Sequence, residues 1–316
     1  MEAAPLIGIA DAPVPEGGRA VWLEAEDGTP LRAALFPAQG AACGTVMLSP
    51  GRTEPIEKYF EVVGELQARG WTVVAHDWRG QGLSGRALPD RLRGYSKGFG
   101  PFLSDYALML DRLGGDLPRP WISLAHSMGG GLVLLAIVRG ERRLDGVITT
   151  APMIGLRAVP VPPPLAGLIA RGACLCGLSA ALLQTYDPFA QPFEGNVLTH
   201  DRIRYDRYMA QLKACPDLAL GGPTWGWLDY ALSAGAVLRR RASAAAVEAP
   251  VSVIGAGQDR LVLSANGRAF AQAASSGRYV EIAQAFHEIL METDPVRATF
   301  WSEFDALAAR ITGRSA

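Results

Sequence analysis

A serine lies in a short motif that is typical of covalent acyl transfer. Residues 125–130 read Ala-His-Ser-Met-Gly-Gly, so small residues stand two positions before and two positions after Ser127. Between a strand and a helix, such a turn projects the hydroxyl beyond the sheet edge, and the helix aims its N-terminus at the same point. The pattern predicts that Ser127 is a nucleophile. The alternative is an ordinary Ser-Gly turn.

A serine hydroxyl needs a base, and the base needs an orienting acid. Of the four histidines, only His287 follows the last strand that the sequence predicts. Asp259 follows the strand before it, which gives the chain order Ser, acid, His. We therefore expect His287 to be the general base and Asp259 its acid. The alternatives are a structural loop histidine and an aspartate that caps a turn. Glu288 and Glu292 are rival carboxylates, and Glu288 ranks lower because a residue adjoining the histidine would point away from the ring.

Two backbone N–H groups are required to stabilise a tetrahedral oxyanion. One is expected from Met128, the residue after the nucleophile. The other is expected from the loop after the first core strand, with Arg52 as first choice and Gly51 as second, because Pro50 has no N–H.

The elements that position these residues alternate along the chain. Short apolar runs predict strands at residues 21–24, 31–36, 44–48, 71–75, 121–124, 147–150, 251–255 and 279–282. Helical spacing predicts helices at residues 56–69, 102–113, 129–139, 264–274 and 295–311.

This alternation predicts an α/β fold with a mostly parallel, doubly wound sheet. It stops near residue 152 and resumes near residue 248. We therefore expect a core made of residues 1–152 and 248–316, with residues 153–247 inserted as a mainly helical cap.

Composition excludes several classes of function. Thirty Lys and Arg against 31 Asp and Glu leave a net charge of −1, which does not favour nucleic acid as a partner. The four histidines lack metal-ligand spacing, so no metal and no cofactor is expected. Residues 1–13 contain no Lys or Arg, unlike a secretory signal, so we expect a cytoplasmic protein. The apolar residues 158–183 leave room for peripheral contact with the inner face of a membrane.

The chain resembles the bacterial lysophospholipases related to monoacylglycerol lipase, which are serine aminopeptidase-like α/β-hydrolases. The matching segments run from about residue 50 to residue 292: GRTEPIEKYFEVV, DWRGQGLSGR, AHSMGG, LTHDRIRYDRYM, GGPTWGWL, GQDRLV and HEILME. Ala125 departs from the glycine that is more usual in the AHSMGG segment. The resemblance implies the α/β-hydrolase fold and an ester substrate of the monoacyl glycerolipid class, phosphorylated or not.

A lipid substrate would need a covered acyl chain and a contact for its headgroup. Trp225, Trp227 and Leu228 are candidates for the acyl wall, and the alternative is that they only pack the cap onto the core. Arg202 and Arg207 are candidates for a phosphate contact, and the alternative is a solvated helix face. The same triad also suits a general carboxylesterase, an acyltransferase or an amidase or peptidase. A binding module without activity is least favoured, because all three triad positions are filled.

Overall fold

One sheet of nine strands organises the described residues of the computed structural model, which are 1–157 and 161–313. The strands are β1 (Ala3–Ala4), β2 (Arg19–Glu24), β3 (Pro30–Phe36), β4 (Gly44–Ser49), β5 (Trp71–His76), β6 (Trp121–His126), β7 (Gly146–Thr150), β8 (Val251–Ala256) and β9 (Gly277–Ile282). Their order across the sheet is β1-β2-β3-β5-β4-β6-β7-β8-β9. β1, β2, β3 and β5 pair antiparallel in turn. From β5 onward, β4, β6, β7, β8 and β9 each pair parallel with the strand before them in the sheet. The predicted mostly parallel sheet is confirmed.

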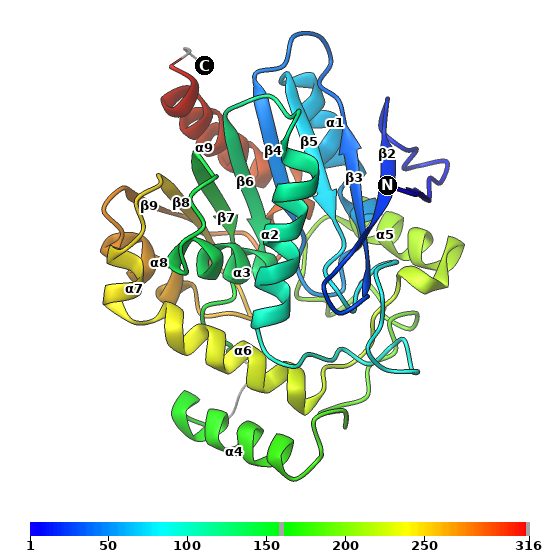
Figure 1. Ribbon diagram of the computed structural model, residues 1–316, viewed down its shortest axis with the longest axis vertical. Coiled ribbons are helices and arrows are strands. Elements are labelled where there is room, and N and C mark those ends of the chain that lie inside the picture. The colour runs from blue at the N-terminus through cyan, green and yellow to red at the C-terminus, as the bar shows by residue number, and fades with distance from the viewer. Residues whose placement is uncertain (158–160, 314–316) are drawn as a thin grey trace.

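Helices cover both faces of this sheet (Figure 1). They are α1 (Phe60–Ala68), α2 (Gly100–Gly114), α3 (Ser127–Val138), α4 (Pro163–Leu175), α5 (Arg202–Ala214), α6 (Trp225–Leu238), α7 (Arg241–Ala245), α8 (Ser264–Ala273) and α9 (Asp294–Thr312). Three short 3₁₀ segments are η1 (Ile56–Tyr59), η2 (Pro216–Leu218) and η3 (Ile289–Met291).

The central strands are apolar throughout because both of their faces are buried. In β4, Met47 packs into the core that α2, α3 and α8 share, whereas Val46 and Leu48 pack into the core under α1 and α9. Side chains alternate across a strand, so one run of six buried residues serves two cores.

The chain between β7 and β8 leaves the sheet and returns to it after α7. Within its described part, α6 packs against α3 and against α4, and α4 lies farther from the sheet (Figure 1). This is the region that the sequence predicts to be an inserted cap.

Candidate active site

Ser127 is the first residue of α3 and follows β6 directly. Its φ is +47°, in the left-handed region that a residue with a Cβ rarely adopts. The turn is crowded, because a Cβ added at Gly129 would fall well inside contact distance of the carbonyl oxygens of Ser49 and Pro50. Ala125 is fully buried and pairs with Ser49 across the β4–β6 ladder, which accounts for a small residue there.

The three residues expected to form a triad meet at the carboxyl ends of β6 and β8. His287 Nε2 lies 2.8 Å from Ser127 Oγ, and His287 Nδ1 lies 2.7 Å from Asp259 Oδ2. All three residues are buried. With Nδ1 protonated, the imidazole donates to the carboxylate and accepts the serine hydroxyl proton at Nε2.

The carboxylate of Asp259 is held in the charged state. Its Oδ1 accepts the backbone N–H groups of Leu261 and Val262 at 2.7 Å and 2.9 Å. Burial would raise the pKa of Asp259, but the bond from His287 and the two N–H groups outweigh it, so this pKa lies below its ordinary value. A charged carboxylate at this point favours an imidazolium at His287 when the serine gives up its proton.

The two residues proposed for the second oxyanion donor differ in what their amides do. Gly51 donates its N–H to Glu54 Oε2 at 2.6 Å, so that amide is occupied, which disfavours the second choice. The Arg52 N–H has no acceptor among the described residues. Met128 lies in the first turn of α3, where an amide has no partner inside its own helix. Arg52 and Met128 therefore offer the unoccupied donors.

A buried charged cluster that the sequence did not predict stands behind this loop. Lys58 Nζ donates to Glu54 Oε1 at 2.8 Å and to Glu288 Oε1 at 2.6 Å, and Tyr59 donates its hydroxyl to Glu54 at 2.6 Å. Burial would raise the pKa of Glu54, but Lys58 and its other donors lower it to about 2. The cluster thus joins the segment after β4 to the residue next to His287. The only sign of this cluster in the sequence is a run of charged residues at the start of a predicted helix.

The neighbouring histidine takes no part in the proton relay. His126 Nδ1 lies 2.9 Å from Thr150 Oγ1, and its ring centroid is 4.9 Å from that of His287. Burial lowers the pKa of His126 to about 4, so the imidazole is neutral at pH 7.

The three apolar cap residues of α6 face different surroundings. Trp225 and Leu228 pack on Ala166 and Ala170 of α4, within the segment between β7 and β8. The Trp227 ring instead lies next to the active-site loop, with its centroid 5.3 Å from Arg52 Cζ. Of the three, Trp227 contacts the segment that carries the expected oxyanion donor.

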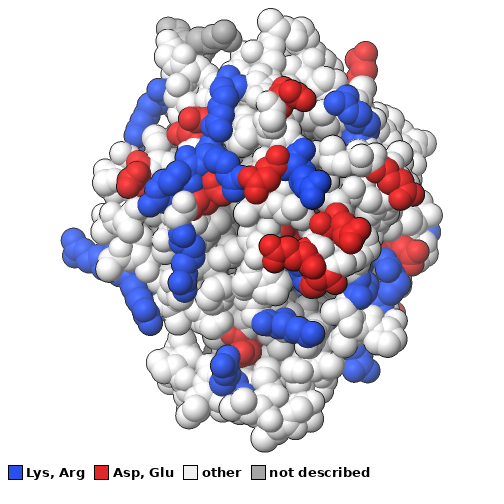
Figure 2. All heavy atoms as spheres, in the orientation of Figure 1, with Lys and Arg blue, Asp and Glu red and all other residues white. Residues whose placement is uncertain are grey.

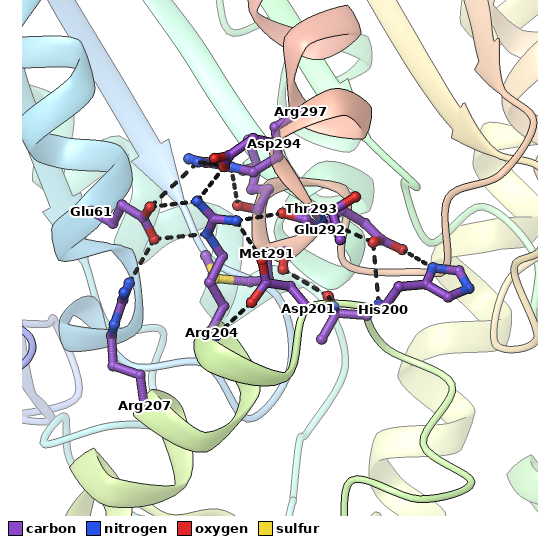
Figure 3. Close-up of polar contacts among 12 residues, drawn as sticks. Glu61, His200, Asp201, Arg204, Arg207, Met291, Glu292, Thr293, Asp294 and Arg297 are labelled. Carbon is purple, nitrogen blue, oxygen red and sulfur yellow. Dashed lines mark hydrogen bonds and ion pairs between the residues drawn. The ribbon is translucent and has the colours of Figure 1, made fainter.

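The two cap arginines suggested for a phosphate contact are paired with carboxylates. Arg202 is exposed and pairs with Glu194 and Asp206. Arg207 Nη1 lies 2.6 Å from Glu61 Oε2. Figure 3 shows Arg204 reaching the same carboxylate from α5, so that Glu61 ties the cap helix to α1. The positive charge of each arginine is therefore already paired with a carboxylate.

Residues 1–157 and 161–313 contain neither a candidate metal cluster nor a candidate membrane-spanning helix. No group of three or more His, Cys, Asp or Glu side chains in that part of the chain is placed to hold a metal ion. No helix there is long and apolar enough to cross a bilayer.

The chain is similar in sequence to a protein family and to named relatives. The family model described as serine aminopeptidase, S33, matches residues 40–294. The chain is 32% identical to lysophospholipase L2 of Escherichia coli (strain K12) over 290 residues, covering 86% of this chain and 82% of that protein. It is 27% identical to the monoacylglycerol lipase of Mycolicibacterium smegmatis, covering 79% and 83%.

Solved structures share the fold. A soluble variant of the Saccharomyces cerevisiae monoglyceride lipase superposes with a TM-score of 0.73 at 21% identity, covering 98% of this chain and 99% of that one. The monoacylglycerol lipase of Paleococcus ferrophilus gives 0.69 at 19% identity, covering 88% and 98%. The predicted fold class is confirmed.

Proposed function

The chain belongs to the serine aminopeptidase S33 family, and from that membership we propose that it is a serine hydrolase that cleaves the carboxylic ester of a monoacyl glycerolipid. One observation carries this proposal: a hydrogen-bond series runs from Asp259 through His287 to Ser127, at 2.7 Å and 2.8 Å. The substrate class is supported by the relatives that are named lysophospholipase L2 and monoacylglycerol lipase.

The reaction proceeds through an acyl-enzyme. Ser127 Oγ attacks the ester carbonyl carbon while its proton moves to His287 Nε2. The oxyanion accepts the N–H groups of Arg52 and Met128. His287 then gives the proton to the departing glycerol oxygen, and water repeats the sequence on the acyl-enzyme to release the fatty acid.

The cap, residues 153–247, covers the acyl chain in this proposal. Trp227 is its contact with the loop at the reacting carbonyl, since its ring lies beside Arg52. Trp225 and Leu228 support the acyl wall from behind through their packing on α4.

The protein meets its lipid at a cytoplasmic membrane surface through α4. Three apolar side chains of this helix are strongly exposed, at 70% for Leu168, 80% for Leu175 and 47% for Leu165. Figure 2 shows few charged side chains over the end of the molecule where α4 lies. An exposed apolar patch rimmed by polar residues is typical of an interaction surface.

A substrate panel tests the proposed reaction. Lysophosphatidylethanolamine, lysophosphatidylcholine, monoacylglycerol, short p-nitrophenyl esters and acyl amides are compared on wild type and Ser127→Ala, with glycerol as acceptor in one arm. Hydrolysis of monoacyl esters, abolished in Ser127→Ala, supports the proposal. Faster cleavage of amides, or net transfer to the acceptor, replaces it by a peptidase or a transferase. Failure of a fluorophosphonate to label Ser127 would favour a binding module.

A further inference from the structure

The Arg52 side chain is partly buried, and most of its hydrogen-bonding capacity is unused. Its Nη2 donates to the carbonyl oxygen of Gly221 at 2.5 Å, and its Cζ lies 5.3 Å from the Trp227 ring centroid. Nε is enclosed and has no acceptor, and Nη1 has none among the described residues. A guanidinium has five N–H donors in a planar fork, so most of those of Arg52 have no acceptor among the described residues.

No carboxylate of the described residues pairs with this cation. Arg202, Arg204 and Arg207 all have acidic partners within ion-pair distance, whereas the titratable groups that act on Arg52 are tyrosines, Tyr186 and Tyr208. Burial lowers the pKa of Arg52 to about 10, so the guanidinium stays charged at pH 7. An unpaired cation that is partly enclosed lowers the stability of a fold, and a bound anion reduces that cost.

The surrounding backbone is shaped to admit the guanidinium. A Cβ added at Gly94 would fall well inside contact distance of Arg52 Nη2. Gly94 donates its N–H to the Gly222 carbonyl at 2.9 Å and accepts the Thr224 N–H at 2.9 Å. The absence of a side chain at Gly94 therefore leaves the space that the Arg52 head occupies between the 92–94 loop and the cap.

We propose that the Arg52 guanidinium is the anion-binding group of the active site and takes the phosphate of a lysophospholipid headgroup. This inference rests on the proposed function, because it names which monoacyl lipid the same site prefers. The Arg52 N–H is the oxyanion donor in that proposal, so its side chain starts beside the ester carbonyl. In a lysophospholipid only the glycerol backbone separates that carbonyl from the phosphate. The planar fork suits two phosphate oxygens, which an ammonium does not match.

The test compares kcat/KM for lysophosphatidylethanolamine and for a monoacylglycerol of the same acyl chain in the same mixed micelles. The variants are Arg52→Gln, Arg52→Lys and Gly94→Ala. Gly94→Ala displaces the Arg52 guanidinium without changing residue 52, so the backbone N–H of Arg52 is retained. Arg278→Gln, which removes an exposed arginine paired with Glu303, controls for net charge.

The proposal expects the ratio of the two kcat/KM values to fall by about tenfold or more in Arg52→Gln and in Gly94→Ala, mainly through KM. Arg52→Lys should lie between these variants and wild type, and Arg278→Gln should keep the ratio. Equal losses on both lipids would overturn the proposal, because they would mean that Arg52 only holds the loop. Competition by inorganic phosphate or glycerol phosphate as strong as that by the intact lysolipid would assign the site to free phosphate.

A binding measurement separates this inference from the proposed reaction. Ether-linked analogues of the two lipids, which have no ester to cleave, are titrated into Ser127→Ala with and without Arg52→Gln. A preference for the phosphate analogue that Arg52→Gln removes supports the anion site even if wild type cleaves neither ester, which would end only the proposed function. Equal affinity for both analogues in Ser127→Ala overturns the anion site.

Discussion

Lys58 Nζ lies 2.6 Å from Glu288 Oε1, and this contact joins two segments that are 230 residues apart. Lys58 belongs to the stretch after β4 that also carries the expected oxyanion donor, and Glu288 is the residue next to His287. Burial would lower the pKa of Lys58, but Glu288 and Glu54 raise it well above its ordinary value. The ion pair therefore ties the segment after β4 to the segment that carries His287.

Replacing Lys58 by methionine should destabilise the protein and slow catalysis together. Methionine keeps the bulk, but it leaves Glu54 and Glu288 buried without their counter-charge, at a cost of about 3–5 kcal/mol. The free energy of unfolding from urea titrations measures the first effect, and kcat at a temperature where the variant is folded measures the second. Lys97→Met, at an exposed position, is the control. Unchanged stability in Lys58→Met would contradict the buried charge cluster.

Asp259→Asn should lower kcat by about 10⁴-fold while the fold persists. The amide oxygen keeps the N–H groups of Leu261 and Val262, but the amide no longer holds His287 in the tautomer that accepts the serine proton. Steady-state rates and circular dichroism measure the two parts of this expectation. Should Glu288→Gln cost far more activity than Asp259→Asn, the acid would have to be reassigned to Glu288.

Gly129→Ala should lower kcat by about 10²–10³-fold, because its methyl group collides with the carbonyl oxygens of Ser49 and Pro50 and displaces the oxyanion loop. Gly64→Ala in α1 is the matched control, since its Cβ meets no atom within 4 Å. That control should stabilise the protein by about 0.5–1 kcal/mol. Equal kcat in the two variants would rule out the role of Gly129 in positioning the loop.

His76 should make the protein less stable as the pH falls. Burial lowers the pKa of His76 to about 3, so the folded state stays neutral while the unfolded chain takes up a proton below pH 6.5. Unfolding then binds a proton, and stability falls by about 1.4 kcal/mol per pH unit from this group. Urea titrations between pH 6.5 and 4.5 should give a shallower slope for His76→Gln than for wild type. The same slope in both proteins would count against a buried neutral imidazole.

Glu61→Gln should loosen the cap helix α5. Arg204 and Arg207 both bind this carboxylate, and Arg297 approaches it from α9 at 3.4 Å (Figure 3). Burial would raise the pKa of Glu61, but these arginines lower it to about 2, so the attachment also weakens as pH falls from about 4.5 towards that value.

Amide hydrogen exchange over residues 202–214 measures the loosening, and faster exchange is expected in Glu61→Gln. Arg202 is the first residue of α5 and pairs with the exposed Glu194. Glu194→Gln removes that pair and should leave exchange unchanged. Equal exchange in both variants would mean that packing alone holds α5.

Local patterns of sequence predicted the elements that hold the triad. The apolar runs that predict strands end within two residues of the observed strands, because hydrophobic periodicity reports burial directly. The turn at residues 125–130, the penultimate strand and the last strand place Ser127, Asp259 and His287 by chain order alone. Their catalytic roles stay a prediction that the geometry supports.

Partners that are distant in the chain could not be predicted. The expected helix at residues 56–69 begins with the 3₁₀ segment η1, in which Glu57 is fixed by Arg32 of β3 at 2.7 Å. Arg207 resembled a solvated or phosphate-binding residue because its partner, Glu61, lies 146 residues away. An arginine in the sequence carries no sign of which carboxylate the fold will bring to it.

The order of the strands has a consequence for biosynthesis. The ribosome makes the nucleophile at the start of α3 well before it makes the acid and the base, which reach the sheet edge only after β8 has paired with β7 and β9 with β8. A nascent chain therefore carries Ser127 without His287 while the 160 residues up to His287 are being made. Activity is therefore expected only after the last part of the polypeptide has emerged and joined the sheet.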